Sequence, residues 1–260
     1  MIRGTRPSWL LAAFSGLIGW LVFSQACRAV ALQPAKSTSL VIVVDGAGGF
    51  EASSKTISRC VVEMNLPLEV RSFHWTHGYL RVAADQMHAS HMRREAQKLA
   101  DLVLSCRNLA PGNPIFLVGH SAGCGLVLWA ADQLPPGTLE GIVLLAPAVS
   151  ADHDLRPALA SSRRGIDVFI SHHDWACLSL GTMLAGTTDR CFTRATGGRL
   201  GFRPIITCPA DGVLYQRLRQ YPWDSSLLWT GHKGGHYGSY QPMFLRLFVL
   251  PLLMPNDQPY

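Results

Sequence analysis

Short apolar runs, separated by stretches with helical character, constrain the fold of this chain more than any other feature. Four such runs lie at Leu40–Asp45, Ile115–Val118, Gly141–Ala146 and Ile166–Ser171. Continuous apolar runs of this length are typical of strands buried on both faces of a parallel sheet. Between the first two, Asp85–Arg107 repeats its apolar residues at about 3.6 positions, as an amphipathic helix does. The alternation predicts an α/β protein with a mostly parallel sheet and helices on both faces.

Four further segments complete the expected set of elements. Leu68–Trp75 alternates between apolar and polar residues and predicts another strand, and Leu227–Thr230 predicts a short final strand. Helices are expected at Ser54–Met64 and at Pro242–Leu250. With these additions the sheet is expected to hold about six strands.

The five residues Gly119-His120-Ser121-Ala122-Gly123 begin directly after one of the apolar runs. Their G-x-S-x-G spacing is weak evidence by itself, but here it stands between an expected buried strand and an apolar helix. In that setting the glycines permit a sharp turn that presents the Ser121 hydroxyl. The first amides of the following helix then face any negative charge that develops there. Ser121 is therefore a candidate nucleophile.

Residues 1–31 have the layout of a secretory signal peptide. Arg3 and Arg6 precede an uncharged run, Trp9–Phe23, and Ala29-Val30-Ala31 supplies an A-x-A cleavage site. We expect cleavage after Ala31 and an exported protein, whether periplasmic, extracellular or associated with the envelope. Two alternatives stay open: an uncleaved membrane anchor, which would be the chain's one contact with a membrane, and a lipid-modified Cys27.

The net charge limits the partners that the chain is expected to bind, and the cysteine count bears on disulfides. The chain carries a formal charge of +6, and loss of Arg3, Arg6 and Arg28 with the signal leaves 6 − 3 = +3. Without a block of like charges or a basic helix stripe, the sequence gives no support for nucleic-acid binding.

Seven cysteines are present, and six remain after cleavage, an even number compatible with disulfides in an exported chain. Cys177 and Cys191 are the expected pair, and Cys124 is expected to be a buried thiol.

The chain resembles the α/β-hydrolase superfamily over roughly residues 38–250. The resemblance rests on four motifs in the family's order: a glycine-rich loop at residues 45–50, the turn around Ser121, an acid loop and a histidine loop. It implies a single α/β-hydrolase domain over residues 32–260. Residues 180–221, rich in Gly, Thr, Arg and Pro, would then form a lid or an irregular insertion, with short helices that the pattern does not locate.

The resemblance also implies a Ser-His-Asp triad. The family's order, Ser then acid then His, selects Asp174 after the strand at Ile166–Ser171 and His236 in the loop before the last helix. His232 competes with His236 for the role of base. The weaker rivals of Asp174 are Asp152, Asp154 and Asp189, and Asp174 could instead cap a helix.

The same resemblance implies an oxyanion hole made by two backbone amides. Ala122 follows the candidate nucleophile, and Ala47 lies in the loop Asp45–Phe50, which is similar to the family's HGGG-type loop with Asp45 in place of a histidine. A phosphate-binding loop is disfavoured, because no G-K-[ST] follows these glycines.

Together these features predict a serine hydrolase that acts on an ester-like bond of a small-molecule or lipid acyl substrate, without a cofactor or metal. Two other hypotheses stay open. The first is a metal hydrolase built from His88 and His91, His172-His173-Asp174 or the His232/His236 loop, although no HExxH motif occurs. The second is a protein of the same fold with no catalysis, acting as a binding or structural component of the envelope.

Overall fold

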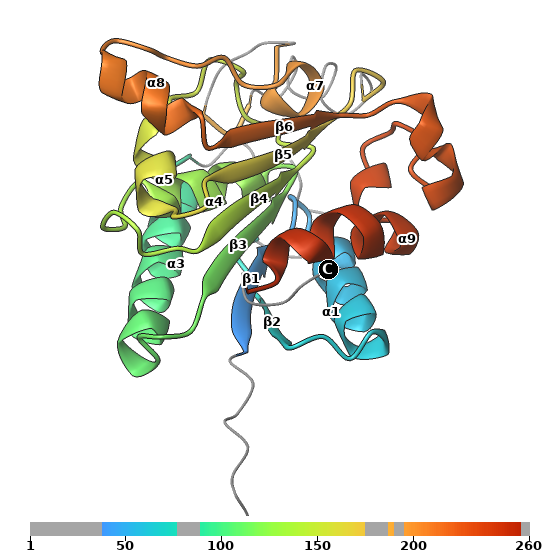
Figure 1. Cartoon of the computed structure of the whole chain (residues 1–260), viewed down its shortest axis with the longest axis horizontal. Helices are drawn as coiled ribbons and strands as arrows, with labels where there is room; N and C mark the ends of the chain where they lie inside the picture. The colour runs from blue at the N-terminus through green and yellow to red at the C-terminus, as the bar shows by residue number, and fades with distance from the viewer. Residues whose placement is uncertain (1–37, 77–88, 175–186, 190–194, 256–260) are drawn as a thin grey trace, which may run out of the picture. The chain divides into compact units, whose positions relative to one another are not determined.

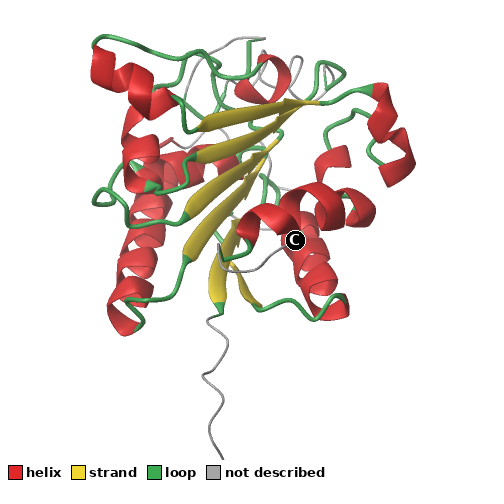
Figure 2. Cartoon of the chain, in the orientation of Figure 1, coloured by secondary structure: helices red, strands yellow, loops and turns green. Residues whose placement is uncertain are grey.

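A computed structural model describes residues 38–76, 89–174, 187–189 and 195–255. Contacts divide the chain into two compact units, Met1–Lys36 and Ser37–Tyr260, and all the described residues lie in the second. Within that unit, six strands form one parallel sheet in the order β2-β1-β3-β4-β5-β6. Figure 2 shows this sheet with helices packed on either side. The strands are β1 (Ser39–Val44), β2 (Leu68–Ser72), β3 (Ile115–His120), β4 (Gly141–Leu145), β5 (Ile166–Ile170) and β6 (Leu218–Pro222).

Helices cover both faces of this sheet (Figure 1). One layer packs around Leu117, Leu144 and Val168; it contains α3 (Ala89–Leu109), α4 (Gly123–Ala131) and α5 (Arg156–Ser161). The opposite layer packs around Val43, Val118 and Phe169; it contains α1 (Ala52–Glu63) and the C-terminal helical stretch α9 (Pro242–Phe244), η4 (Leu245–Val249) and η5 (Leu250–Leu253). The predicted parallel sheet with helices on both faces is confirmed.

The strand order locates the functional edge of the sheet. The chain moves outward from β1 to β2 and then crosses back to β3, so the order reverses between β1 and β3. In open α/β sheets, ligands bind at the carboxyl ends of the strands beside such a reversal. The loop after β1 contains Ala47, and the residue after β3 is Ser121.

The sixth strand differs from the prediction. The prediction of a strand at Leu227–Thr230 is wrong, because this segment lies in a 3-10 helix, η2 (Ser225–Thr230). The Asp224 carboxylate caps the first turn of η2 by accepting from Ser226 N at 2.7 Å. The edge strand is β6 instead, in the segment predicted to be a lid or irregular insertion.

The apolar pattern did not predict β6 because its sequence, Leu-Arg-Gln-Tyr-Pro, is mostly polar. Arg219 Nε and Nη2 each donate to the buried Asp167 carboxylate of β5 at 2.7 Å, and Tyr221 Oη donates to it at 2.8 Å. The Gln220 amide exchanges hydrogen bonds with the backbone of Phe202. A strand whose side chains find polar partners shows no apolar alternation, and Pro222 is tolerated because the strand is at the edge.

Residues between β5 and β6 contain the short helices expected there: α7 (Gly197–Leu200) and α8 (Pro209–Tyr215). Residues 1–37, Cys177 and Cys191 lie outside the described residues, so the signal peptide and the disulfide stay predictions. Among the described residues, the cysteines are free thiols, and Cys124 is buried as expected. No helix within the described ranges is both long and apolar enough to cross a membrane.

Candidate active site

Ser121 occupies a strained turn at the end of β3. Its φ of 54° is left-handed, a region that non-glycine residues rarely adopt. Two hydrogen bonds hold it there: Ser121 N donates to Leu145 O at 3.0 Å, and Ala148 N donates to Ser121 O at 3.1 Å. Both partners belong to β4 or the loop that follows it, so the neighbouring strand fixes the serine backbone.

Both glycines of the motif are required by close contacts. A Cβ on Gly119 would lie 2.8 Å from Cys124 Cα, and a Cβ on Gly123 would lie 2.3 Å from Val44 O and 2.5 Å from Asp45 O. Helix α4 can therefore start directly against the end of β1 because no side chain intervenes. This contact brings the loop after β1 beside Ser121.

Three sequence-predicted side chains meet at this turn. The Ser121 hydroxyl is 2.8 Å from His236 Nε2, and His236 Nδ1 is 2.6 Å from Asp174 Oδ2. The carboxylate can only accept, so Nδ1 carries a proton and donates to it; Nε2 is then free to accept from the serine hydroxyl. Asp174 and His236 are 3% and 8% exposed, which strengthens both interactions by removing competing water.

The loops carrying the acid and the histidine are joined directly. Ser171 Oγ, at the end of β5, donates to Gly234 O at 2.5 Å, and Asp174 N donates to Ser171 O at 3.1 Å. Gly234 has φ of +80°, and a Cβ there would lie 3.2 Å from His173 Cβ. Ser171 was not among the predicted site residues, since a serine ending a strand carries no signal of its own.

His232, the rival base, shapes this loop. Its Nδ1 accepts from Gly234 N at 3.1 Å, and its ring fills space that a Cβ on Gly238 would occupy, 2.0 Å away. Burial lowers the pKa of His232 to about 4, against an opposing attraction from Asp174. It is therefore neutral near pH 7, and the structure brings His236 rather than His232 to Ser121.

The rival acids have other partners. Asp189 accepts from Ser150 N at 3.1 Å and lies 3.2 Å from His153 Nδ1. Asp154 pairs with Arg156, and Asp152 pairs with Arg203 at an exposed site. These three carboxylates therefore have partners other than His236, and Asp174 is the carboxylate that contacts His236.

The glycine-rich loop after β1 is braced by Asp45. The buried Asp45 carboxylate accepts from Ser53 N at 2.8 Å and from Ser53 Oγ at 2.5 Å, in the first turn of α1. Asp45 O accepts from Trp75 Nε1 at 2.8 Å. These bonds hold residues 46–51 at the end of the sheet. They give Asp45 a structural role at the position where the α/β-hydrolase superfamily often has a histidine.

The two predicted oxyanion amides are available to a ligand. A Cβ on Gly46 would lie 3.1 Å from Ser121 Cβ, so the loop containing Ala47 approaches the serine closely. Within the part of the chain that the structure describes, no protein acceptor pairs with the backbone amide of Ala47 or of Ala122. The start of α4 adds its positive dipole end at the same place.

His120 supports the site in a way that the sequence did not indicate. Its buried Nε2 donates to His236 O at 3.3 Å, and its ring contacts the rings of His236 and Tyr240 at centroid distances of 5.0 and 4.9 Å. Burial, reinforced by the nearby His236, lowers the pKa of His120 to about 3. His120 is therefore neutral near pH 7, and its contacts support the loop that carries His236.

Of the residues considered for a metal, Asp174 and His236 contact each other, and no third candidate ligand joins them among the described residues. His88 lies outside the described residues, while His91 Nε2 contacts Trp75 O at 2.7 Å. Within the described ranges, no three His, Cys, Asp or Glu side chains gather as a group that would hold a metal. Tyr237, 58% exposed, lies edge-on to the His236 ring in the same loop.

Comparisons with known proteins agree with this architecture. A family model described as serine aminopeptidase, S33, matches residues 76–177, a range that includes Ser121 and Asp174 and ends before His236. No curated protein matches the chain significantly.

Several solved structures are similar over most of the chain. A cutinase-like protein from Cryptococcus sp. is 13% identical with a TM-score of 0.42, covering 85% of this chain and 97% of its own. Est1E from Butyrivibrio proteoclasticus is 12% identical with a TM-score of 0.45, covering 84% and 89%. The catalytic core of acetyl xylan esterase from Trichoderma reesei is 12% identical with a TM-score of 0.40, covering 81% and 98%. Identities and TM-scores this low carry no information about activity.

Proposed function

We propose that this chain belongs to the α/β-hydrolase superfamily and is a serine hydrolase that cleaves an ester-like acyl bond with Ser121, His236 and Asp174. One observation carries the proposal: a continuous hydrogen-bonded line runs from Asp174 through His236 to the Ser121 hydroxyl, with steps of 2.6 and 2.8 Å. A serine hydroxyl is a poor nucleophile until such a base accepts its proton.

Acylation follows from this arrangement. Ser121 Oγ attacks the substrate carbonyl carbon while its proton passes to His236 Nε2. The imidazolium that forms keeps its Nδ1 proton on Asp174, whose negative charge stabilises it. His236 then gives the proton to the departing alkoxide, so an alcohol leaves and the acyl group remains on Ser121.

Deacylation uses the same base. Water replaces the alcohol, His236 Nε2 removes its proton as the oxygen attacks the acyl-enzyme, and the proton returns to Ser121 Oγ as the acid departs. In both steps, the carbonyl oxygen becomes negative and is held by the amides of Ala47 and Ala122. Removing one such donor costs roughly a hundredfold to a thousandfold in kcat.

Hydrolysis of nitrophenyl esters with graded acyl chain length tests this proposal. Wild type is expected to hydrolyse at least one ester, and Ser121→Ala to lose roughly 10⁴-fold or more in kcat. His236→Gln should lose a similar factor. Activity retained by Ser121→Ala would refute the proposed nucleophile.

His232→Gln is the matched control for the histidine. Its site lies in the same loop, but its ring contacts Gly234 N and not Ser121, so the loss is expected to be far smaller than for His236→Gln. Equal losses would point to a role of the loop in folding rather than of His236 in proton transfer.

The second candidate is a protein of this fold that binds without catalysis. It is favoured if wild type hydrolyses no acyl ester of any length.

The same series of esters reports on substrate size. A preference for long acyl chains would indicate a lipid substrate, and a preference for acetyl or butyryl esters would indicate a small one.

We further propose that the protein is exported and processed after Ala31. Expression in a secreting host should yield a mature chain beginning at Leu32, which amino-terminal sequencing or intact mass will detect. A mature chain that retains Trp9–Phe23 would instead support the uncleaved anchor.

A further inference from the structure

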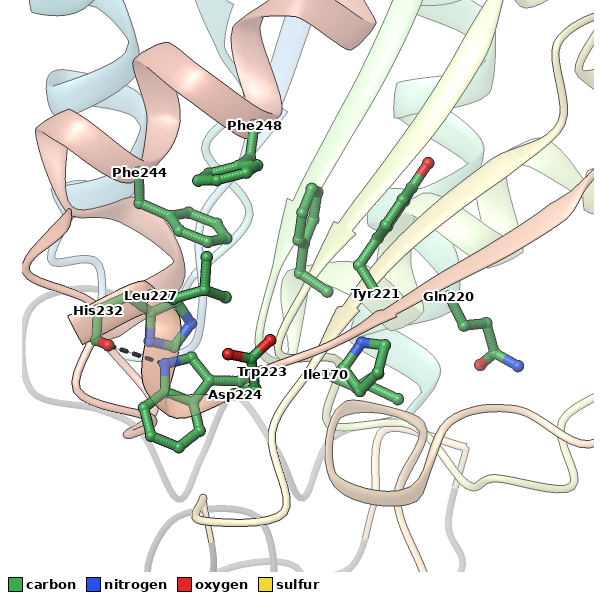
Figure 3. A pocket seen from close by; sticks show the side chains of 11 residues that line it. Ile170, Gln220, Tyr221, Trp223, Asp224, Leu227, His232, Phe244 and Phe248 are labelled. Atoms are coloured by element: carbon green, nitrogen blue, oxygen red, sulfur yellow. Dashed lines mark hydrogen bonds between the residues drawn. The ribbon is translucent and has the colours of Figure 1, made fainter. Parts of the chain in front are cut away.

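A cavity of about 350 Å³ lies between the ends of β5 and β6 and the segment from Asp224 to Phe248 (Figure 3). Its lining includes neither Ser121, Asp174 nor His236. Its volume is at the lower end of the range for small-molecule sites. The cavity is therefore distinct from the candidate active site and suits a ligand of modest size.

Five of the eleven residues that line it are phenylalanine, tyrosine or tryptophan. Phe169 stacks on Tyr221 with ring centroids 5.0 Å apart, and it meets Phe244 edge to face at 5.4 Å. Phe248 and Trp223 complete the aromatic lining. Aromatic faces carry partial negative charge and attract cations, most strongly where water is excluded.

Asp224 supplies the charge. It is the one acidic residue in the lining, which contains no lysine or arginine, and Figure 3 shows its carboxylate among the lining side chains. Its hydrogen bonds from Ser226 lower the pKa of the carboxyl, so the group is ionised near pH 7. Aromatic faces and an unbalanced carboxylate thus line one space.

From this juxtaposition we propose that the cavity is a binding site for an organic ammonium ion with an apolar body. The apolar body fits against Leu227, Phe244 and Phe248, and the ammonium group lies between the aromatic faces and the Asp224 carboxylate. A fatty acid is disfavoured because its own carboxylate would be repelled by Asp224. An uncharged apolar molecule would leave the charge of Asp224 without a counter-ion.

The site borders the histidine loop. Trp223 and His232 both line the cavity, and Trp223 Nε1 donates to His232 O at 2.8 Å, a bond drawn in Figure 3. A bound ligand therefore contacts Trp223 directly, and the indole provides a fluorescent reporter of binding that does not depend on hydrolysis.

Titration of the whole protein with phenethylammonium and with phenethyl alcohol tests the proposal, because the two probes differ mainly in charge. Calorimetry and tryptophan fluorescence should both detect saturable binding, with the ammonium at least tenfold tighter. Equal affinities, no binding of either probe, or tighter binding of octanoate than of phenethylammonium would overturn the proposal.

Asp224→Asn is the informative variant. Asparagine caps a helix about as well as aspartate, so η2 should keep its start while the charge is lost. The preference for the ammonium should then disappear, while phenethyl alcohol binds as before. Asp152→Asn, at an exposed carboxylate paired with Arg203, is the control and should leave both affinities unchanged; an unaltered ammonium preference in Asp224→Asn would refute the site.

Discussion

Ser121 adopts a backbone conformation that serine rarely takes. The turn fits because the neighbouring Gly119 and Gly123 have no side chains. The φ of 54° is fixed by hydrogen bonds to Leu145 and Ala148, and Gly119 and Gly123 leave room for the turn. Such strain is typical of functional sites, where the surrounding structure determines the geometry. We therefore expect even one added methyl group at Gly119 or Gly123 to be strongly destabilising.

Gly123→Ala is expected to reduce folded protein or stability by several kcal/mol, since overpacking against backbone cannot relax easily. The added Cβ would lie 2.3 Å from Val44 O. Urea denaturation measures the effect. Gly112→Ala is the control: nothing lies within 4 Å of its Cβ, and its change should be under about 0.5 kcal/mol. Equal stability of the two variants would contradict the contact.

Acid sensitivity follows from the buried neutral His120. Its pKa is about 3 in the folded protein and near 6.5 when unfolded. Between these pH values the unfolded state takes up a proton that the folded state does not, so stability falls as the pH falls through this window. The slope is about 1.4 kcal/mol per pH unit at most for one group. Burial raises the pKa of Asp132 to about 6, which opposes the trend.

Comparing variants separates these effects. His120→Phe removes the titrating group, and its stability is expected to depend less steeply on pH between 6.5 and 4 than that of the wild type, by about one proton. Chemical denaturation at several pH values measures the slopes. Identical slopes for the two proteins would show that His120 is not the group that takes up the proton.

At the scale of elements, the sequence predicted those whose stability comes from apolar burial. β1, β3, β4 and β5 were visible as apolar runs, and α3 as a helical repeat. β6 was missed because its stability comes from Asp167, a polar residue inside an otherwise apolar run. Leu227–Thr230 is mostly apolar but forms a 3-10 helix capped by Asp224, since a run of four residues is too short to distinguish a strand from a helical turn.

Asp167→Asn tests the role of this pair at the sheet edge. Asp167 is 5% exposed and accepts from Arg219 and Tyr221, so its loss leaves the guanidinium with a weaker partner. A decrease of about 2 kcal/mol in the free energy of unfolding is expected. The exposed pair of Asp152 and Arg203 supplies a control, because Asp152→Asn should change it by under about 1 kcal/mol. Equal effects would mean that β6 is held by its backbone alone.

At the scale of the whole molecule, the chain order of the candidate residues predicted which side chains meet, although 115 positions separate Ser121 from His236. Parallel strands end at one edge, so residues that directly follow β3 and β5 converge there whatever their separation in sequence. The supporting residues did not follow from this rule. Asp45, His120 and Ser171 act through hydrogen bonds to particular loop atoms, and loop conformation is not encoded in an apolar pattern.

Reaction with a fluorophosphonate probe, followed by mapping of the adduct by mass spectrometry, shows whether Ser121 is an activated nucleophile. We expect one adduct on Ser121 in the wild type, none in Ser121→Ala and strongly slowed labelling in His236→Gln, because the base that activates the hydroxyl is lost. A wild-type protein that is folded but unlabelled, or an adduct that persists in Ser121→Ala, would contradict it.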